Sequence, residues 1–218
     1  IPSNVMASHN GLDLDIQWDY QQDIDFAYHR IDHLGETIFT IENQQTVELE
    51  GFYDEYLVNS VDANDNRSDN EIYVAAYNLH AGANLITFPL VDENGSLSSG
   101  LGSILSSLSG IISEGEASTL INGNFYGSLN SLELHKGYWI KVDEPDVLLM
   151  TGYKPESQET SYSLHSGANL VSYLCSFDGS LNLLPEGCSE LIGEGVAATQ
   201  INGTWYGSES TLKPGKGY

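Results

Sequence analysis

One stretch of this chain occurs twice, and this internal repeat constrains the fold more than any other feature of the sequence. Four blocks of a first copy return in the same order in a second copy: 79–85 as 164–170, 112–115 as 192–195, 121–128 as 201–208, and 136–138 as 216–218. The first block is shifted by 85 residues (164 against 79) and the others by 80 (192 against 112). A segment that shortens while its flanks stay aligned is typical of a surface loop, so one structural unit is used twice.

The two copies differ at their ends. The first copy continues through an alternating apolar stretch at 138–142, which predicts a strand, whereas the second ends at Tyr218, where that strand is expected to begin. We therefore expect the chain to be a piece of a longer protein. The edge left in the second copy is expected to be completed by the following residues or, by strand addition, by a neighbouring copy.

Residues 1–77 alternate between apolar and polar residues in about seven short runs, such as Leu14, Ile16 and Trp18 between polar residues. This spacing is typical of a β-sandwich. The sequence thus predicts a mainly β fold: a sandwich at 1–77, repeat domains at 78–153 and 164–218, and a linker at 154–163. Each repeat is expected to hold at most one short helix, with 101–108 and 181–184 as the candidates.

Several short motifs resemble known families. Pro2-Ser3-Asn4-Val5, Trp18, Tyr28-His29-Arg30 and the stretch 56–62 resemble a bacterial fibronectin type III domain. That resemblance implies an immunoglobulin-like sandwich, with Trp18, Tyr56 and Val58 in the core between its sheets, acting as a spacer or binding module.

The repeat resembles a unit with a "GxNLIS" strand, a variable middle and a "GYW" strand, here at 82–87 and 137–139. The resemblance implies a large multi-domain secreted or cell-surface protein, often one with a type IX secretion signal. It brings no catalytic residue with it.

The charge balance excludes some partners. The chain has 31 acidic residues against 7 lysines and arginines, a formal net charge of −24. Phosphate binding needs clustered cations, so nucleic acid and anionic membrane surfaces are not expected as partners. No apolar run is long enough to cross a bilayer. A solvated acidic surface and divalent cation binding both remain open.

The densest group of oxygen ligands is Asp62, Asn64, Asp65 and Asp69, which resembles the calcium-binding linker of cadherins. Calcium is therefore a possible cofactor, although the same residues are common in a plain turn. His29 and His33 are four residues apart on one strand and could ligate zinc, but without a third ligand we expect surface histidines.

Two cysteines, Cys175 and Cys188, lie in the variable loop of the second copy only. We predict a disulfide between them, worth on the order of 3 kcal/mol. The alternative is two free, buried small side chains.

The repeat offers few candidates for chemistry. Glu114 and Glu194 match, and paired carboxylates could hydrolyse glycosides if they faced one another across a cleft. The alternative is that each glutamate binds a backbone N–H or faces water, and that each of the matching histidines, His80 and His165, has a fixed structural partner. In Phe125-Tyr126 and Trp205-Tyr206, alternation predicts one ring inside and one outside. Tyr126, Tyr206 and Trp205 are thus candidates for stacking on a glycan.

These observations favour a non-catalytic extracellular or cell-surface segment that serves adhesion, display or fibre structure. Its expected partners are other domains of the same protein and neighbouring copies. The alternative is a carbohydrate-binding region appended to a secreted hydrolase.

Overall fold

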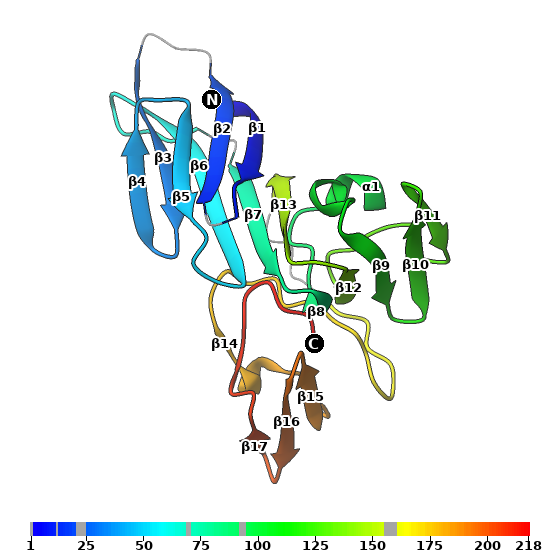
Figure 1. Cartoon of the computed structure of the whole chain (residues 1–218). Coiled ribbons are helices and arrows are strands. Elements are labelled where there is room, and N and C mark those ends of the chain that lie inside the picture. Colours follow the sequence, from blue (N-terminus) through cyan, green and yellow to red (C-terminus); the bar gives the residue numbers. More distant parts are fainter. Residues whose placement is uncertain (1, 12, 21–24, 69–70, 92–94, 155–160) are drawn as a thin grey trace.

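A computed structural model describes residues 2–11, 13–20, 25–68, 71–91, 95–154 and 161–218. The chain is mainly β-structure in several small antiparallel sheets, which confirms the predicted fold class (Figure 1). The N-terminal part contains seven strands in two sheets. One sheet has the order β1-β2-β5, and the other contains β7-β6-β3-β4. The bounds are β1 Pro2–His9, β2 Asp13–Tyr20, β3 Phe26–His33, β4 Glu36–Thr40, β5 Gln44–Glu48, β6 Tyr53–Asp62 and β7 Ile72–Leu79.

The core of this sandwich lies between the two sheets. Side chains from both sheets form one buried cluster, with Leu14, Ile16 and Trp18 on β2 packing with Tyr56 and Val58 on β6. Trp18 is 2% exposed. The alternation in the sequence and the inward positions predicted for Trp18, Tyr56 and Val58 are therefore confirmed, because residues two apart on a strand share a face. The family resemblance itself remains a prediction.

An eighth strand joins the larger sheet from beyond the predicted domain boundary. Strand β13 (Asp146–Gly152) pairs antiparallel with β7 from Asp146↔Leu79 to Gly152↔Tyr73. The sequence places these residues in the first repeat, but the structure places them in the sheet of the sandwich. Both strands are apolar over most of their length, as expected for strands that are covered on both faces.

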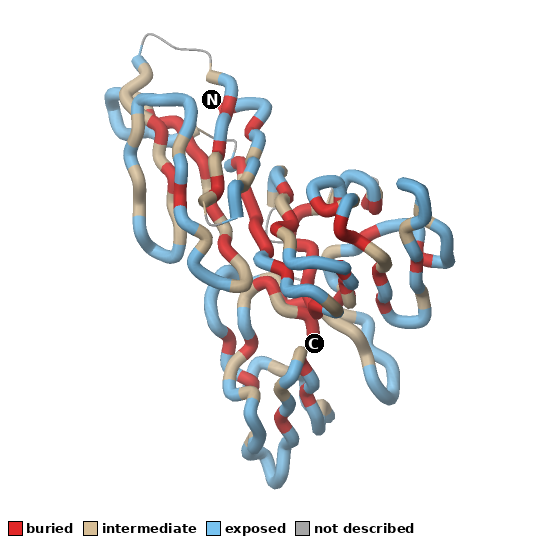
Figure 2. The backbone as a smooth tube through the Cα atoms, in the orientation of Figure 1, coloured by how far each residue is buried: buried red, intermediate tan, exposed pale blue. Residues whose placement is uncertain are grey.

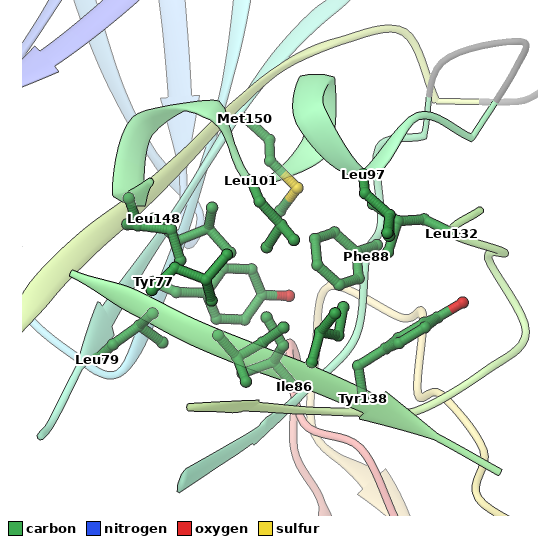
Figure 3. Packing of buried hydrophobic residues seen from close by; sticks show 14 of the residues in the cluster. Tyr77, Leu79, Ile86, Phe88, Leu97, Leu101, Leu132, Tyr138, Leu148 and Met150 are labelled. Carbon is green, nitrogen blue, oxygen red and sulfur yellow. The ribbon is translucent and has the colours of Figure 1, made fainter. Parts of the chain in front are cut away.

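The second face of β7 and β13 supports the core of the first repeat. Tyr77, Leu79, Leu148 and Met150 pack there against apolar side chains of the repeat (Figure 3). The Tyr77 hydroxyl also donates to the Thr87 carbonyl at 2.8 Å. The red, buried stretches of Figure 2 accordingly run from the sandwich into the first repeat. Sandwich and first repeat therefore share a core.

The first repeat forms a five-stranded sheet of order β11-β10-β9-β12-β8. The predicted helix at 101–108 is displaced: α1 is Leu97–Gly100, a 3-10 turn covers Gly102–Ile104, and β9 already begins at Leu108. The helix starts early because the Ser96 side chain caps it by accepting from the Ser99 N–H. The strands are β8 Gly82–Ile86, β9 Leu108–Ser113, β10 Glu116–Ile121, β11 Asn124–Gly127 and β12 Tyr138–Val142.

The second repeat has the same local geometry. Its meander β15-β16-β17 matches β9-β10-β11, and the predicted helical turn is a 3-10 turn at Leu181–Leu183. Backbone φ angles agree closely at matching turns, 49° and 51° at Asn122 and Asn202, and 107° and 106° at Gly82 and Gly167. The strands are β14 Gly179–Ser180, β15 Glu190–Gly193, β16 Val196–Ile201, β17 Thr204–Gly207 and β18 Thr211–Leu212.

The expected linker, 154–163, lies largely outside the described residues. None of the helices in the described parts of the chain is long and apolar enough to cross a membrane.

Candidate functional site: the junction between the repeats

The candidate site is the surface where the two repeats meet, which we call the repeat junction. It is built from two kinds of turn, and each repeat contributes one of each. The first kind follows β9 and β15, where Glu114 and Glu194 precede glycines with φ of 72° and 71°. This left-handed backbone favours glycine and ends each strand so that the glutamate projects from the turn.

The second kind of turn carries the histidines. The Asn84 side-chain oxygen accepts from the His80 N–H at 3.0 Å, and its amide donates to the His80 carbonyl at 2.8 Å. Asn169 holds His165 in the same way, at 2.9 Å for both bonds. The repeated His-x-Gly-x-Asn pattern therefore fixes a rigid turn that presents an imidazole.

The two kinds of turn meet across the junction and not within one repeat. Glu194 accepts hydrogen bonds from the His80 ring and, at 2.9 Å, from the Leu85 N–H. Glu114 accepts in the same way from the His165 ring and, at 3.0 Å, from the Leu170 N–H. Each glutamate thus binds the opposite repeat, which confirms the expectation of a backbone N–H for the carboxylates and fixed partners for the histidines.

Backbone contacts continue the junction beyond these side chains. The Gly137 N–H donates to the Leu170 carbonyl at 3.1 Å, and the Gly217 N–H donates to the Leu85 carbonyl at 3.4 Å. Isolated bridges join Lys136 to Val171 and Ile86 to Lys216. The Lys-Gly-Tyr block of each repeat therefore lies alongside the first strand of the other.

The charges at the junction reinforce one another. Hydrogen bonding to Glu194 raises the pKa of His80, and hydrogen bonds to the Ser166 carbonyl and to Glu114 raise the pKa of His165. The Leu170 N–H and His165 lower the pKa of Glu114. Burial alone would raise the pKa of Glu194, but its bonds to His80 and Leu85 and the nearby Lys216 lower it. The His80–Glu194 and His165–Glu114 contacts, which we call the clamps, are therefore ion pairs near pH 5–6.

We expect nuclear magnetic resonance titration to find pKa values above 6.5 for His80 and His165. The contribution of each imidazolium to stability is present below pH 6.5 and is lost as pH rises through the raised folded pKa. The carboxylate contribution is present above pH 4.5 and is lost as pH falls through the lowered folded pKa. In Glu114→Gln/Glu194→Gln both histidine pKa values should fall toward 6.5, whereas Glu144→Gln, on the exposed surface, should leave them raised. Unchanged histidine titrations in the double variant would contradict this assignment.

The second repeat also contacts the sandwich. The Lys216 ammonium lies 3.2 Å from the ring centroid of Phe52, and burial lowers its pKa. Lys154 pairs with Glu55 at 2.6 Å, and the Ser176 hydroxyl donates to the same carboxylate at 3.0 Å. Five of the chain's seven lysines and arginines make ion pairs with carboxylates: Arg30, Lys136, Lys154, Lys213 and Lys216.

The loop predicted as a calcium site folds as a turn around one carboxylate. Asp62 accepts from the backbone N–H groups of Asn64 and Asn66, both at 2.8 Å, and from the Asn66 side chain. Asp65 accepts from the Tyr28 hydroxyl instead. Asp69 lies outside the described residues, and among those described no three His, Cys, Asp or Glu side chains are grouped to hold a metal ion. Calcium binding at this loop stays a proposal.

The expectation that His29 and His33 are surface residues is wrong for His29, which is 0% exposed. Its Nδ1 lies 3.0 Å from the Ser60 hydroxyl, and its ring packs edge-on against Trp18 and Tyr20. Burial lowers its pKa to about 4. His33 is partly buried, with Nδ1 2.9 Å from the Glu55 carbonyl oxygen and its ring stacked on Tyr56.

The predicted disulfide is not formed in the structure, where Cys175 and Cys188 are free thiols. Cys175 is exposed, and the Cys188 thiol is turned to the Glu190 carbonyl oxygen at 3.4 Å. A shared loop brings two cysteines near each other in the sequence, but it does not fix the directions of their side chains, on which disulfide formation depends.

The aromatic pairs alternate as predicted. Tyr126 and Tyr206 are both 59% exposed, while Phe125 and Trp205 pack against the core of their own repeat. The Trp205 ring is therefore partly buried, whereas the rings of Tyr126 and Tyr206 are exposed.

Comparison with known proteins identifies no family for this chain. No family model and no curated protein matches this chain. Among solved structures, Chitinase ChiA74 from Bacillus thuringiensis is similar at a TM-score of 0.31 and 11% sequence identity, over 70% of this chain and 26% of that one. The chain therefore spans about a quarter of the length of that structure.

Proposed function

We propose that this chain is a non-catalytic extracellular segment of a larger secreted or cell-surface protein, with a role in adhesion, display or fibre structure. The observation that carries the proposal is the repeat junction. The candidates for catalysis in the repeats are the two glutamates and the two histidines. All four side chains are engaged in holding the two repeats together: Glu114, Glu194, His80 and His165.

A mechanical or spacing role also fits the contacts that join the sandwich to the two repeats. Strand β13 returns from the first repeat into the sheet of the sandwich, and the two share a core. Lys216 and Lys154 tie the second repeat to the same body. Successive units joined by paired strands and side chains would move as one piece.

Single-molecule stretching tests this proposal. We expect the second repeat to separate first, and the sandwich with the first repeat to unfold later as one event. Glu114→Ala/Glu194→Ala should lower the force of the first event only, whereas Glu144→Ala should change neither. Independent unfolding of the first repeat, or hydrolysis of a polysaccharide that Glu114→Gln/Glu194→Gln abolishes, would refute the proposal.

A second candidate function, glycan binding, is favoured by the exposure of Tyr126 and Tyr206 at matching positions. Flat rings beside polar side chains can stack on sugars. If this is correct, Tyr126→Ala/Tyr206→Ala should lose retention on insoluble cellulose, chitin or xylan without a change in melting temperature.

The matched control is Tyr153→Ala, because Tyr153 is also 59% exposed but belongs to neither hairpin. Equal retention of the double variant and of this control would dismiss the tyrosines as a glycan site.

A further inference from the structure

The repeat junction is self-complementary. Four kinds of contact between the repeats occur in both directions: the histidine to the glutamate, the leucine N–H to the glutamate, the glycine N–H to the leucine carbonyl, and the lysine bridge to the first strand. Such reciprocity is the mark of an isologous, two-fold interface, in which one surface patch binds a second copy of itself.

Within this reciprocal surface, the turn before Lys-Gly-Tyr differs between the two repeats in its backbone-determining residues. In the second repeat the turn is Pro214-Gly215, with φ of 73° at the glycine. In the first repeat it is Leu134-His135. The carbonyl oxygens of these matching residues have matching partners, because Gly215 accepts from the Thr87 N–H and His135 from the Ser172 N–H.

The surroundings of the two turns are not equivalent. A Cβ on Gly215 would come within 3.0 Å of the Tyr53 side chain on β6. The His135 ring instead packs near Tyr162, with 5.4 Å between ring centroids. Beside the first repeat, Tyr53 of the sandwich therefore leaves no room for a side chain at the position of Gly215. Beside the second repeat, the matching position has room for the His135 ring.

We propose that the junction surface of the first repeat selects which copy of the repeat docks on it, here the second repeat, by requiring glycine at the position of Gly215. A copy with the Pro-Gly turn docks against Tyr53. A copy with Leu134-His135 in its place is rejected, so first repeats of two chains do not pair with each other. The surface thus determines that a second repeat, and not another first repeat, packs against the sandwich and the first repeat.

The full chain provides the first test. Gly215→His should release the second repeat, seen as loss of hydrogen-exchange protection at the Leu85 and Leu170 N–H groups and as a larger radius of gyration. Gly203→His is the matched control, because Gly203 lies in the turn between β16 and β17 and has φ of 80° but nothing within 4 Å of an added Cβ. Retained protection in Gly215→His, or equal loss in both variants, would overturn the selection.

Residues 1–153 provide the second test, because both larger core clusters lie wholly within them. This fragment should be folded and monomeric across a concentration series. Leu134→Pro/His135→Gly, which gives it the turn of the second repeat, should double its mass in solution, and adding Glu114→Ala should restore the monomer. A dimer of the unmodified fragment, or a folded monomer of the Pro-Gly variant, would overturn the proposal. Should the fragment not fold, the full-chain test alone decides.

Discussion

Gly127→Ala is expected to destabilise the first repeat by about 3 kcal/mol or more, since overpacking against backbone atoms cannot be relieved by turning a side chain. A Cβ on Gly127 would lie closer than 3.0 Å to the Ala117 carbonyl oxygen and to the Ser118 Cα. The same carbonyl accepts from the N–H groups of Ser128 and Leu129. The clash therefore falls where the chain leaves the hairpin and enters the core at Leu129, which is 1% exposed.

Thermal unfolding followed by near-ultraviolet circular dichroism provides the measurement, and a loss of this size lowers the midpoint by roughly 6–12 °C in a chain of this length. Gly207→Ala should have the same effect on the second repeat, because its Cβ would meet the Ala197 carbonyl oxygen and the Ala198 Cα. Gly102→Ala is the control, since a Cβ there meets nothing within 4 Å. A midpoint equal to that of the control would show that the hairpin accommodates the Cβ.

The second large effect is expected from pH. His29 has a pKa of about 4 in the folded chain against an ordinary value of 6.5, because burial opposes its charge. As pH falls from 6.5 to 4, the unfolded chain therefore takes up a proton before the folded chain does, and stability decreases. At about 1.4 kcal/mol for each pKa unit, the loss comes to about 3 kcal/mol, complete near pH 4.

Denaturant unfolding at a series of pH values tests this expectation. His29→Gln can still hydrogen-bond to Ser60 but cannot titrate, so its stability should vary little between pH 6.5 and 4.5. The clamp carboxylates of Glu114 and Glu194 have lowered pKa values and lose their charge only below this range. A wild-type chain as stable at pH 4.5 as at 6.5 would mean that the imidazole is not buried in solution.

Local patterns determined much of the fold. Strand alternation predicted that Leu14, Ile16 and Trp18 share one face, because neighbouring residues on a strand face opposite sides regardless of what lies beyond them. The Asn-Gly pairs at 122–123 and 202–203 are typical of hairpin turns, and both adopt the positive φ angles that such turns require. The repeated blocks likewise predicted two copies with the same local geometry.

Contacts between residues distant in the sequence were decided only by the tertiary structure. No local pattern indicates that β13 leaves the first repeat to pair with β7, or that Glu114 and Glu194 each bind the opposite repeat. The burial of His29 under Trp18 and Tyr20 and the orientation of the cysteines depend on packing in the same way. The physical reason is range: turn and strand preferences act within a few residues, whereas pairing and burial depend on which surfaces the folded chain brings together.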